Sequence, residues 1–213
     1  MNMPRLLCFD MDSTLIECEM VARMAELSGR GAEVAEMTRQ AMEGREEFNH
    51  NLLRRVNILK GLGIESIERL AASMPVRREL PIVLNALRSS GYIPAIIGGI
   101  GFFSRRLAAK AGIPYLFTTE LELDASGKLT GRVIGSPLSA SGKAQALRVL
   151  ARSLGIPRQA VAAVGDGAND IEMLRAAHKA VAFRPKPGVA EASGAILCDG
   201  SLLDAIKALG IPI

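Results

Sequence analysis

The chain has no tryptophan and few other aromatic residues, so it has little with which to stack on the bases of a nucleic acid. Aromatic side chains make up 4% of the sequence. Its basic residues are scattered along the chain rather than gathered into a tract, which argues against a polyanionic partner. We therefore expect no nucleic-acid partner.

Long hydrophobic runs are missing too. No apolar stretch approaches the roughly eighteen residues of a membrane-spanning helix. Residues 1–4 are too short and polar to act as a secretory signal. The three cysteines, Cys8, Cys18 and Cys198, are odd in number and unrelated in spacing, which favours a reducing compartment. We therefore expect a cytoplasmic protein without membrane contact, either a monomer or a homodimer.

Helical patterns without a convincing strand fill residues 15–75, whereas strands and helices alternate from residue 76 onward. With 213 residues, 49% of them hydrophobic, the chain can bury one good core and a small accessory domain. The alternation predicts an α/β fold with a Rossmann-like, mostly parallel sheet flanked by helices. Residues 1–14 and 76–213 are expected to form this core and residues 15–75 a helical cap inserted after the first strand. Strands are expected at 6–9, 93–97, 115–117, 161–164, 180–183 and 195–198, with a β-hairpin at 121–134.

Two carboxylates follow directly on the first apolar run. Asp10 and Asp12 stand at the carboxyl end of the expected strand 6–9, which is where open α/β sheets bind ligands. Two positions apart on an extended backbone, they face the same side and repel each other unless a cation separates them. Because no His or Cys lies at matching spacing, Mg²⁺ is favoured over Zn²⁺. A polar turn that caps the next helix is the alternative interpretation.

A second acidic group repeats this arrangement. Asp166, Asn169 and Asp170 follow the expected strand 161–164, with glycines at 165 and 167 that permit a sharp approach. Several carboxylates gathered at one edge of a sheet are costly without a metal. The two groups are therefore expected to share one metal site.

Two further features point to an anion. Gly98 and Gly99 lie between an expected strand and a helix, where their backbone N–H groups can approach an anion closely. Lys143 lies in the first turn of an expected helix, where the helix dipole disfavours a cation. Taken alone, however, a Gly-Gly turn and a solvated lysine are equally good interpretations.

The two acidic motifs carry a family resemblance. Asp10-Met-Asp12-Ser-Thr resembles the first motif of the haloacid dehalogenase superfamily of phosphohydrolases, and Gly165-Asp-Gly-Ala-Asn-Asp170 resembles its fourth, in a form similar to that of phosphoserine phosphatases. The resemblance spans nearly the whole chain, with no ACT-type regulatory domain expected before it. It implies a Mg²⁺-dependent phosphomonoesterase that hydrolyses O-phospho-L-serine through an aspartyl phosphate, in L-serine biosynthesis. The net charge of +4 suits a small phosphorylated amino acid as the substrate.

The resemblance also implies roles for individual residues. Asp10 is the expected nucleophile, Asp12 the acid/base and Lys143 the cation that neutralises phosphate. The expected Mg²⁺ ligands are Asp10, the Asp12 carbonyl and Asp166, supported by Asp170. The expected substrate-binding residues are Glu19 for the ammonium group, Arg55 for the carboxylate, and Met42, Phe48, Gly98, Gly99 and Asn169.

One position departs from the family pattern. Where the family has a Ser or Thr before the Gly-Gly pair, this chain has Ile97, and Ser104, the nearest hydroxyl, is not expected to reach a phosphate. Loss of one hydrogen bond to a charged phosphate costs about 1.5–3 kcal/mol. Ile97 either leaves the phosphate site without a donor or packs among apolar neighbours in a rebuilt loop. The alternatives are therefore a phosphatase or phosphotransferase for another small phosphoester, such as phosphohomoserine, and a catalytically weak protein that binds a phosphorylated ligand.

Overall fold

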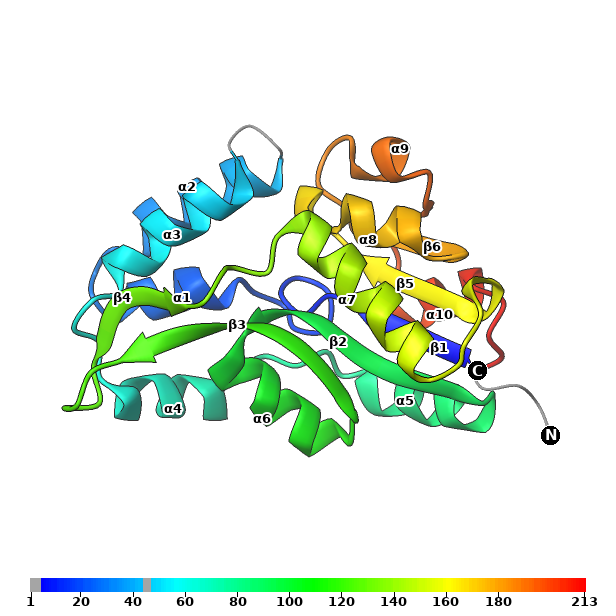
Figure 1. The fold of residues 1–213 in the computed structure, drawn as a ribbon, viewed down its shortest axis with the longest axis horizontal. Helices are drawn as coiled ribbons and strands as arrows, with labels where there is room; N and C mark the ends of the chain where they lie inside the picture. Colours follow the sequence, from blue (N-terminus) through cyan, green and yellow to red (C-terminus); the bar gives the residue numbers. More distant parts are fainter. Residues whose placement is uncertain (1–4, 44–46) are drawn as a thin grey trace.

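One sheet runs through the molecule in the strand order β4-β3-β2-β1-β5-β6-β7 (Figure 1). The computed structural model describes residues 5–43 and 47–213. All neighbouring strands are parallel except β3 and β4, which form an antiparallel hairpin. The strand bounds are β1 Arg5–Phe9, β2 Tyr92–Ile100, β3 Tyr115–Leu123, β4 Leu129–Ile134, β5 Val161–Gly165, β6 Lys179–Phe183 and β7 Ile196–Cys198.

Strand β1 lies in the middle of the sheet because both of its faces are apolar. Leu6 to Phe9 have no exposed surface. Leu7 and Phe9 belong to the apolar cluster on one face of the sheet, whereas Leu6 and Cys8 belong to the cluster on the other. Paired with β2 on one side and β5 on the other, β1 delivers the residue after Phe9 to the centre of the sheet's carboxyl edge.

Helices cover both faces of the sheet. The first cluster includes side chains from α5 Leu80–Ser89, α6 Gly101–Ala111 and α10 Leu202–Ala208. The second includes side chains from α7 Ala140–Ser153, α8 Ile171–Ala176 and α9 Val189–Ser193. Two short 3₁₀ helices, η1 Arg158–Ala160 and η2 Ala168–Asp170, precede and follow β5. The sheet therefore lies between two layers of helices, and the predicted fold class is confirmed.

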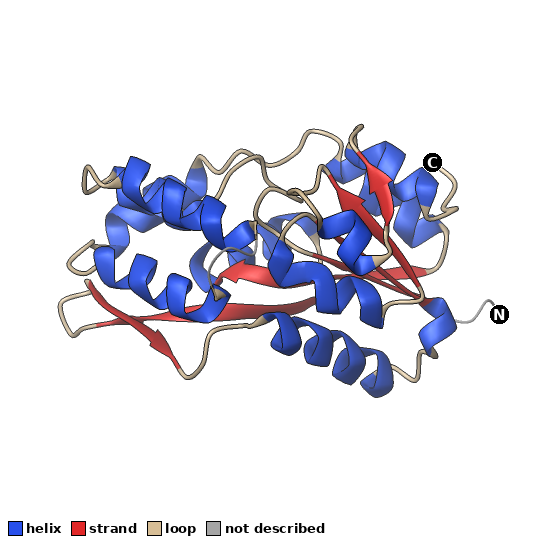
Figure 2. Cartoon of the chain, turned by 90° about the horizontal axis from the view of Figure 1, so that it is seen from above, coloured by secondary structure: helices blue, strands red, loops and turns tan. Residues whose placement is uncertain are grey.

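A helical segment separates β1 from α5. It consists of α1 Met20–Glu26, α2 Gly31–Met42, α3 Phe48–Ile58 and α4 Ile64–Ala72. Figures 1 and 2 show these helices, with the β3–β4 hairpin, at one end of the molecule. The hairpin braces the segment through backbone hydrogen bonds, such as the one from the N–H of Gly61 to the carbonyl of Leu129 (2.8 Å). The division into a core (1–14 and 76–213) and a cap (15–75) stays a prediction, because one apolar cluster runs from the sheet into these helices.

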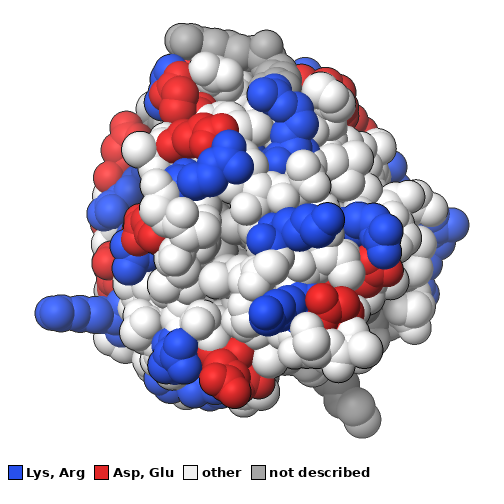
Figure 3. Space-filling model, turned by 90° about the vertical axis from the view of Figure 1, so that its left-hand side faces the viewer, with Lys and Arg blue, Asp and Glu red and all other residues white. Residues whose placement is uncertain are grey.

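The surface of this end carries charges of both signs. Figure 3 shows basic and acidic side chains interspersed over it. Several are paired along the same helix, as in the ion pairs Arg30–Glu33 (2.7 Å) and Arg39–Glu36 (2.6 Å). The face therefore has no wide patch of uncompensated positive charge. Among the described helices, none is long and apolar enough to span a bilayer.

The strand bounds differ from the sequence expectation by more than one residue in two places. Strand β2 continues through Gly98 and Gly99 to Ile100, whereas the sequence predicted its end at Ile97. Strand β3 is one continuous strand, although the sequence divided it between a strand at 115–117 and the first arm of a hairpin. Both differences have one cause, the pairing of Ile100 with Thr119 beyond an irregularity that starts at Ile97.

The two connections to the helical segment lie side by side. Ile16 and Val76 form an antiparallel bridge, flanked by a hydrogen bond from the Arg77 N–H to the Leu15 carbonyl (3.0 Å). Arg77 is 6% exposed, and its guanidinium donates to the carbonyls of Thr14 (2.7 Å) and Ser13 (2.8 Å). It also lies over the Phe183 ring at 4.8 Å. Arg77 thus fixes the loop after β1 to the point where the chain returns to the sheet.

Replacement of Arg77 by Met is expected to destabilise the protein by about 2–4 kcal/mol, because two backbone carbonyls lose a charged donor in a buried place. Urea unfolding measures this change. Arg78→Met is the matched control, since Arg78 is exposed and should lose less than about 0.5 kcal/mol. Equal losses in the two variants would contradict the role given to Arg77.

Candidate active site

The carboxyl ends of the central strands meet at one cavity. Asp10 follows β1, Gly98 and Gly99 end β2, and Asp166 follows β5. The cavity has a volume of about 40 Å³. Its lining comprises Asp10, Asp12, Glu19, Val21, Phe48, Leu52, Arg55, Gly98, Gly99, Ile100, Thr119, Leu138, Lys143, Asp166 and Asn169. Residues distant in sequence therefore share one small space, between the sheet and the helical segment.

Lys143 joins two of the acidic residues. Its ammonium group donates to the carboxylate of Asp10 and to that of Asp170 (2.7 Å), and it is 2% exposed. Burial acts to lower the pKa of Lys143, but the two carboxylates outweigh it and raise the pKa above its usual value. Lys143 is therefore a fixed positive charge beside Asp10.

Three buried carboxylates can hold a cation. Asp10, Asp166 and Asp170 each offer an oxygen, and these atoms lie within 4.8 Å of one another. Asp166 Oδ1 accepts from the Thr14 hydroxyl (3.2 Å), whereas its Oδ2 is buried without a hydrogen bond, with the Lys186 ammonium 3.7 Å away. At that distance Lys186 offers charge but no hydrogen bond, and a directly bound cation would satisfy the oxygen. Hard oxygen donors suit a divalent ion of the Mg²⁺ or Ca²⁺ kind, so the residues fit a divalent metal.

Electrostatics in the site point the same way. Burial and the nearby Asp170 raise the pKa of Asp10 to about 7, against the opposing effect of Lys143. Burial raises the pKa of Asp166 well above its usual range, and the charges of Asp10 and Glu19 add to the shift. Lys143 and Lys186, whose ammonium lies 3.7 Å from Asp166 Oδ2, do not offset these effects, and a divalent cation between the oxygens would stabilise the charged carboxylates.

Asp170 organises the loop after β5 instead of facing the cavity. Its Oδ2 accepts from the N–H groups of Asp166 (3.2 Å) and Gly167 (3.0 Å), and its Oδ1 accepts from Lys143. Asn169, its neighbour, lines the cavity with a buried amide oxygen that lacks a hydrogen-bond partner. Asp170 therefore holds the loop in place, whereas Asn169 faces the cavity, where it can contact a ligand.

Asp12 lies at the junction of the sheet and the helices. Its carboxylate accepts from the N–H of Met20, the first residue of α1 (3.3 Å). Removal from water raises the pKa of Asp12 well above its usual range, and Glu19 and Asp10 contribute further. Its carboxylate is not part of the three-oxygen cluster, and the expected role of its carbonyl as a metal ligand stays a prediction.

The helical segment adds one acidic and one basic side chain. Glu19 accepts from the Ser13 hydroxyl (2.7 Å), and Ser13 holds a left-handed backbone with φ of 58°. Arg55 is 2% exposed, donates to the Thr38 hydroxyl (2.9 Å) and lies over the Phe48 ring at 5.9 Å. Both charged groups are therefore held in place by neighbours before any ligand arrives.

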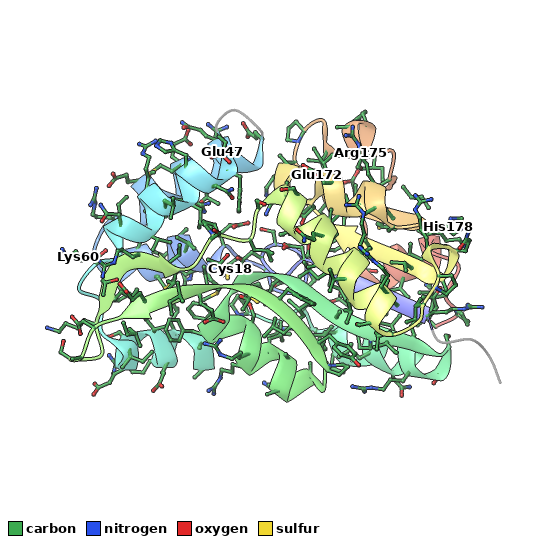
Figure 4. All side chains as sticks on the ribbon, viewed as in Figure 1. Cys18, Glu47, Lys60, Glu172, Arg175 and His178 are labelled. Atoms are coloured by element: carbon green, nitrogen blue, oxygen red, sulfur yellow. The ribbon has the colours of Figure 1, made fainter. Side chains whose placement is uncertain are left out.

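A wider cavity of about 330 Å³ adjoins the first and shares Phe48 and Asn169 with it. Its lining includes Glu47, which directly precedes α3, and Glu172, in α8, and Figure 4 labels both. Cys18, labelled near the centre of the same figure, lies where the chain passes from the β1 loop to α1. The wider cavity thus offers an approach to the small one.

Most of the residues singled out in the sequence come together at the small cavity. Asp170 lies behind Lys143, and the side chain of Met42, at the end of α2, lies outside the part of the chain that the structure describes. Sequence reasoning missed Thr119, whose hydroxyl accepts from the Leu138 N–H (3.0 Å), and the hydrogen bond of Thr14 to Asp166. Thr14 belongs to the first acidic motif, so the sequence could have identified it. Thr119 has no such signal, because it comes near the site only through the pairing of β3 with β2.

Ile97 packs among apolar neighbours, the second of the two outcomes considered. It has no exposed surface, belongs to the cluster beneath α7 and does not line the cavity. Gly98 instead comes against Asp10 and Lys143, so closely that a Cβ on it would collide with the Asp10 carboxylate. The backbone at Gly98 thus occupies the space where a side chain was expected.

Comparison with known proteins gives one consistent family. The family model for haloacid dehalogenase-like hydrolases matches residues 4–178. A phosphoserine phosphatase of Archaeoglobus fulgidus is 37% identical over 98% of this chain, which spans 60% of that relative's length. One of Idiomarina loihiensis is 35% identical over 96% of this chain and 93% of its own. Several other relatives are also longer, and the chain spans about half their length.

A solved structure described as a phospho-aspartyl intermediate analogue of phosphoserine phosphatase superposes with a TM-score of 0.92. It is 33% identical to this chain, and the match covers 98% of this chain and 99% of the other. The whole architecture, including the helical segment, is therefore similar in the two proteins.

Ile97→Ser is expected to lower the free energy of unfolding by about 2–4 kcal/mol, because the change leaves a cavity and a buried hydroxyl in an apolar cluster. Denaturant unfolding provides the measurement. Ile134→Ser is the control, since Ile134 is 61% exposed and should change little. A variant at position 97 as stable as the parent would show that Ile97 does not pack in this way.

Proposed function

The chain belongs to the haloacid dehalogenase-like hydrolases, and on that basis we propose that it hydrolyses O-phospho-L-serine to L-serine and phosphate through an aspartyl phosphate on Asp10. One observation carries the proposal. The small cavity combines Asp10 and Lys143, which suit phosphoryl transfer, with Glu19 and Arg55, which suit an amino acid. The relatives that are named phosphoserine phosphatases support the same substrate.

The phosphoryl group is expected to meet the sheet side of the cavity. Asp10 attacks phosphorus as the nucleophile, and Lys143 neutralises charge on the phosphoryl oxygens. We propose Mg²⁺ as the divalent metal, held by Asp10, Asp166 and the Asp12 carbonyl, with Asp170 supporting the site. When bound, it would offset the repulsion between the phosphate dianion and the carboxylate nucleophile.

Asp12 is proposed to move the proton. In its neutral form it donates to the departing serine oxygen, and in its ionised form it then accepts a proton from the water that hydrolyses the acyl phosphate. The hydrogen bond from the Met20 N–H to its carboxylate supports this role, because it holds the group in one orientation at the cavity wall. The helices above the site are proposed to exclude other water during these steps.

The helical segment is proposed to recognise the amino acid. Glu19 receives the ammonium group and Arg55 the carboxylate, with Phe48 and Met42 closing over the ligand and Asn169 holding it from the sheet side. The cavity is small and lies between the sheet and the helical segment, which favours a small substrate. Because Ile97 packs away from the cavity, it does not obstruct a ligand there, but the hydroxyl that the family places at this position is still missing, and the weak binding protein stays the alternative.

We further propose that the protein acts in L-serine biosynthesis, in the cytoplasm, as a monomer or a homodimer. No partner beyond the small phosphorylated amino acid is needed for the proposed activity.

Release of inorganic phosphate from O-phospho-L-serine tests the activity. We expect turnover with Mg²⁺, none with excess EDTA, and a loss of at least about 10³-fold in Asp10→Asn, because the amide is a far weaker nucleophile. Asp199→Asn is the control, since Asp199 is exposed and does not line the cavity. Substantial turnover by Asp10→Asn would exclude the aspartyl phosphate.

Comparison of two substrates tests the recognition of the amino acid. Glu19→Gln and Arg55→Lys each preserve bulk, and each is expected to reduce kcat/KM for phosphoserine by about tenfold to a hundredfold. p-Nitrophenyl phosphate has neither an ammonium nor a carboxylate group, so its hydrolysis should change by less than about threefold. Equal losses on the two substrates would mean that these residues support the fold and not the selectivity.

A further inference from the structure

Two hydroxyl groups lie behind the loop that ends β2. Ser104 Oγ, in α6, lies 3.1 Å from the Gly98 carbonyl oxygen and 3.1 Å from that of Ile100. Thr118 Oγ1, in β3, donates to the Gly99 carbonyl (2.8 Å) and lies 3.3 Å from Ser104 Oγ. Ser104 has no exposed surface, and neither residue lines the cavity. Together, the two elements contact three consecutive carbonyl groups, those of Gly98, Gly99 and Ile100.

These contacts set the direction of the backbone donors. In the described residues every peptide bond is trans, and in a planar trans peptide the N–H points away from the preceding carbonyl. With the Gly98 carbonyl held toward Ser104, the Gly99 N–H points to the opposite side of the loop. Gly98 faces Asp10 and Lys143, since a Cβ on it would meet both, and Gly99 lines the cavity whereas Ser104 does not. A Gly99 N–H on the side away from Ser104 can therefore meet a ligand in the cavity.

The fit behind the loop explains the glycine at position 99. Its φ is +73°, and a Cβ there would come within 2.6 Å of Ser104 Oγ and 2.8 Å of the Met11 methyl carbon. Ser104 Oγ also lies 3.2 Å from Met11 Sδ, next to the nucleophile. The hydroxyl thus fills the space that a side chain would need, and it ties the loop to the residue that follows Asp10.

We propose that Ser104 and Thr118 are positioning residues for phosphate binding, holding the Gly98 and Gly99 carbonyls so that the Gly99 N–H meets a phosphoryl oxygen. The inference rests on the proposed function, because the ligand at this N–H is the phosphoryl group of the substrate. Neither hydroxyl touches phosphate. The donor that Ile97 does not supply is provided by the backbone, and the two hydroxyls fix its direction.

An ordinary structural role is the competing explanation. A buried serine often bonds back to the carbonyl four residues before it, and Ser104 does so to Ile100. This common pattern within a helix does not explain Thr118, which donates to the Gly99 carbonyl from the neighbouring strand β3. The two explanations differ in one measurable respect, the affinity for phosphate.

The test compares Ser104→Ala, Thr118→Val, the double variant and Thr118→Ser by calorimetric titration with inorganic phosphate in the presence of Mg²⁺. Each hydroxyl deletion is expected to weaken phosphate binding by about threefold to thirtyfold, and the double variant by more. Thr118→Ser keeps the hydroxyl and should bind as the parent does. Ser193→Ala is the matched control, since its hydroxyl also reaches two helix carbonyls (2.7 and 3.2 Å) but lies in α9.

Kinetics with two substrates complete the test. Because the loop grips the phosphoryl group, kcat/KM should fall by the same factor for phosphoserine and for p-nitrophenyl phosphate. Lower melting temperatures with unchanged phosphate affinity, or no phosphate binding by the parent, would overturn the inference. Failure of the parent to hydrolyse phosphoserine would instead refute the proposed substrate, and the phosphate titrations would still decide the role of the hydroxyls.

Discussion

The arrangement of the site depends on the buried ammonium group of Lys143. Its ammonium group lies between Asp10 and Asp170, and all three side chains are almost entirely removed from water. An ammonium or carboxylate buried alone is very unstable, so each of these groups keeps its place only while the others keep theirs. The triad also leaves a surplus of negative charge, since Asp166 lies within the same cluster. A divalent cation between the carboxylate oxygens would offset that surplus.

Much of this arrangement could be read from the sequence because its signals are local. An apolar run that ends at acidic residues predicts a strand and the position of its carboxyl end. Such a run precedes Asp10, and another precedes Asp166. Once two such ends lie in one parallel sheet, their meeting follows from the topology. The residues of the helical segment, among them Glu19 and Arg55, have no such signal. They were identified only by family resemblance, and the structure then brought them to the same cavity.

The rest depends on contacts between elements that the sequence does not relate. The pairing of β2 with β3 carries β2 through two glycines, although glycine is disfavoured inside a strand. Thr119 enters the site because β3 lies beside β2. Ser104 was considered too remote to act, which is right for direct contact with a ligand, but the packing of α6 places it behind the loop. Ile97 was ambiguous for the same reason, since the direction of its side chain depends on the path of the backbone at Gly98.

The bridge between Ile16 and Val76 has a consequence for how such a protein can evolve. Because the chain leaves the sheet and returns to it at adjacent positions, the intervening segment can lengthen, shorten or be replaced without changing the register of any strand. Arg77 holds these two connections together from the sheet side. It does so through backbone carbonyl groups, which are present whatever the side chains are. New substrate preferences can then arise by remodelling the helices alone, while the machinery for phosphoryl transfer is inherited unchanged.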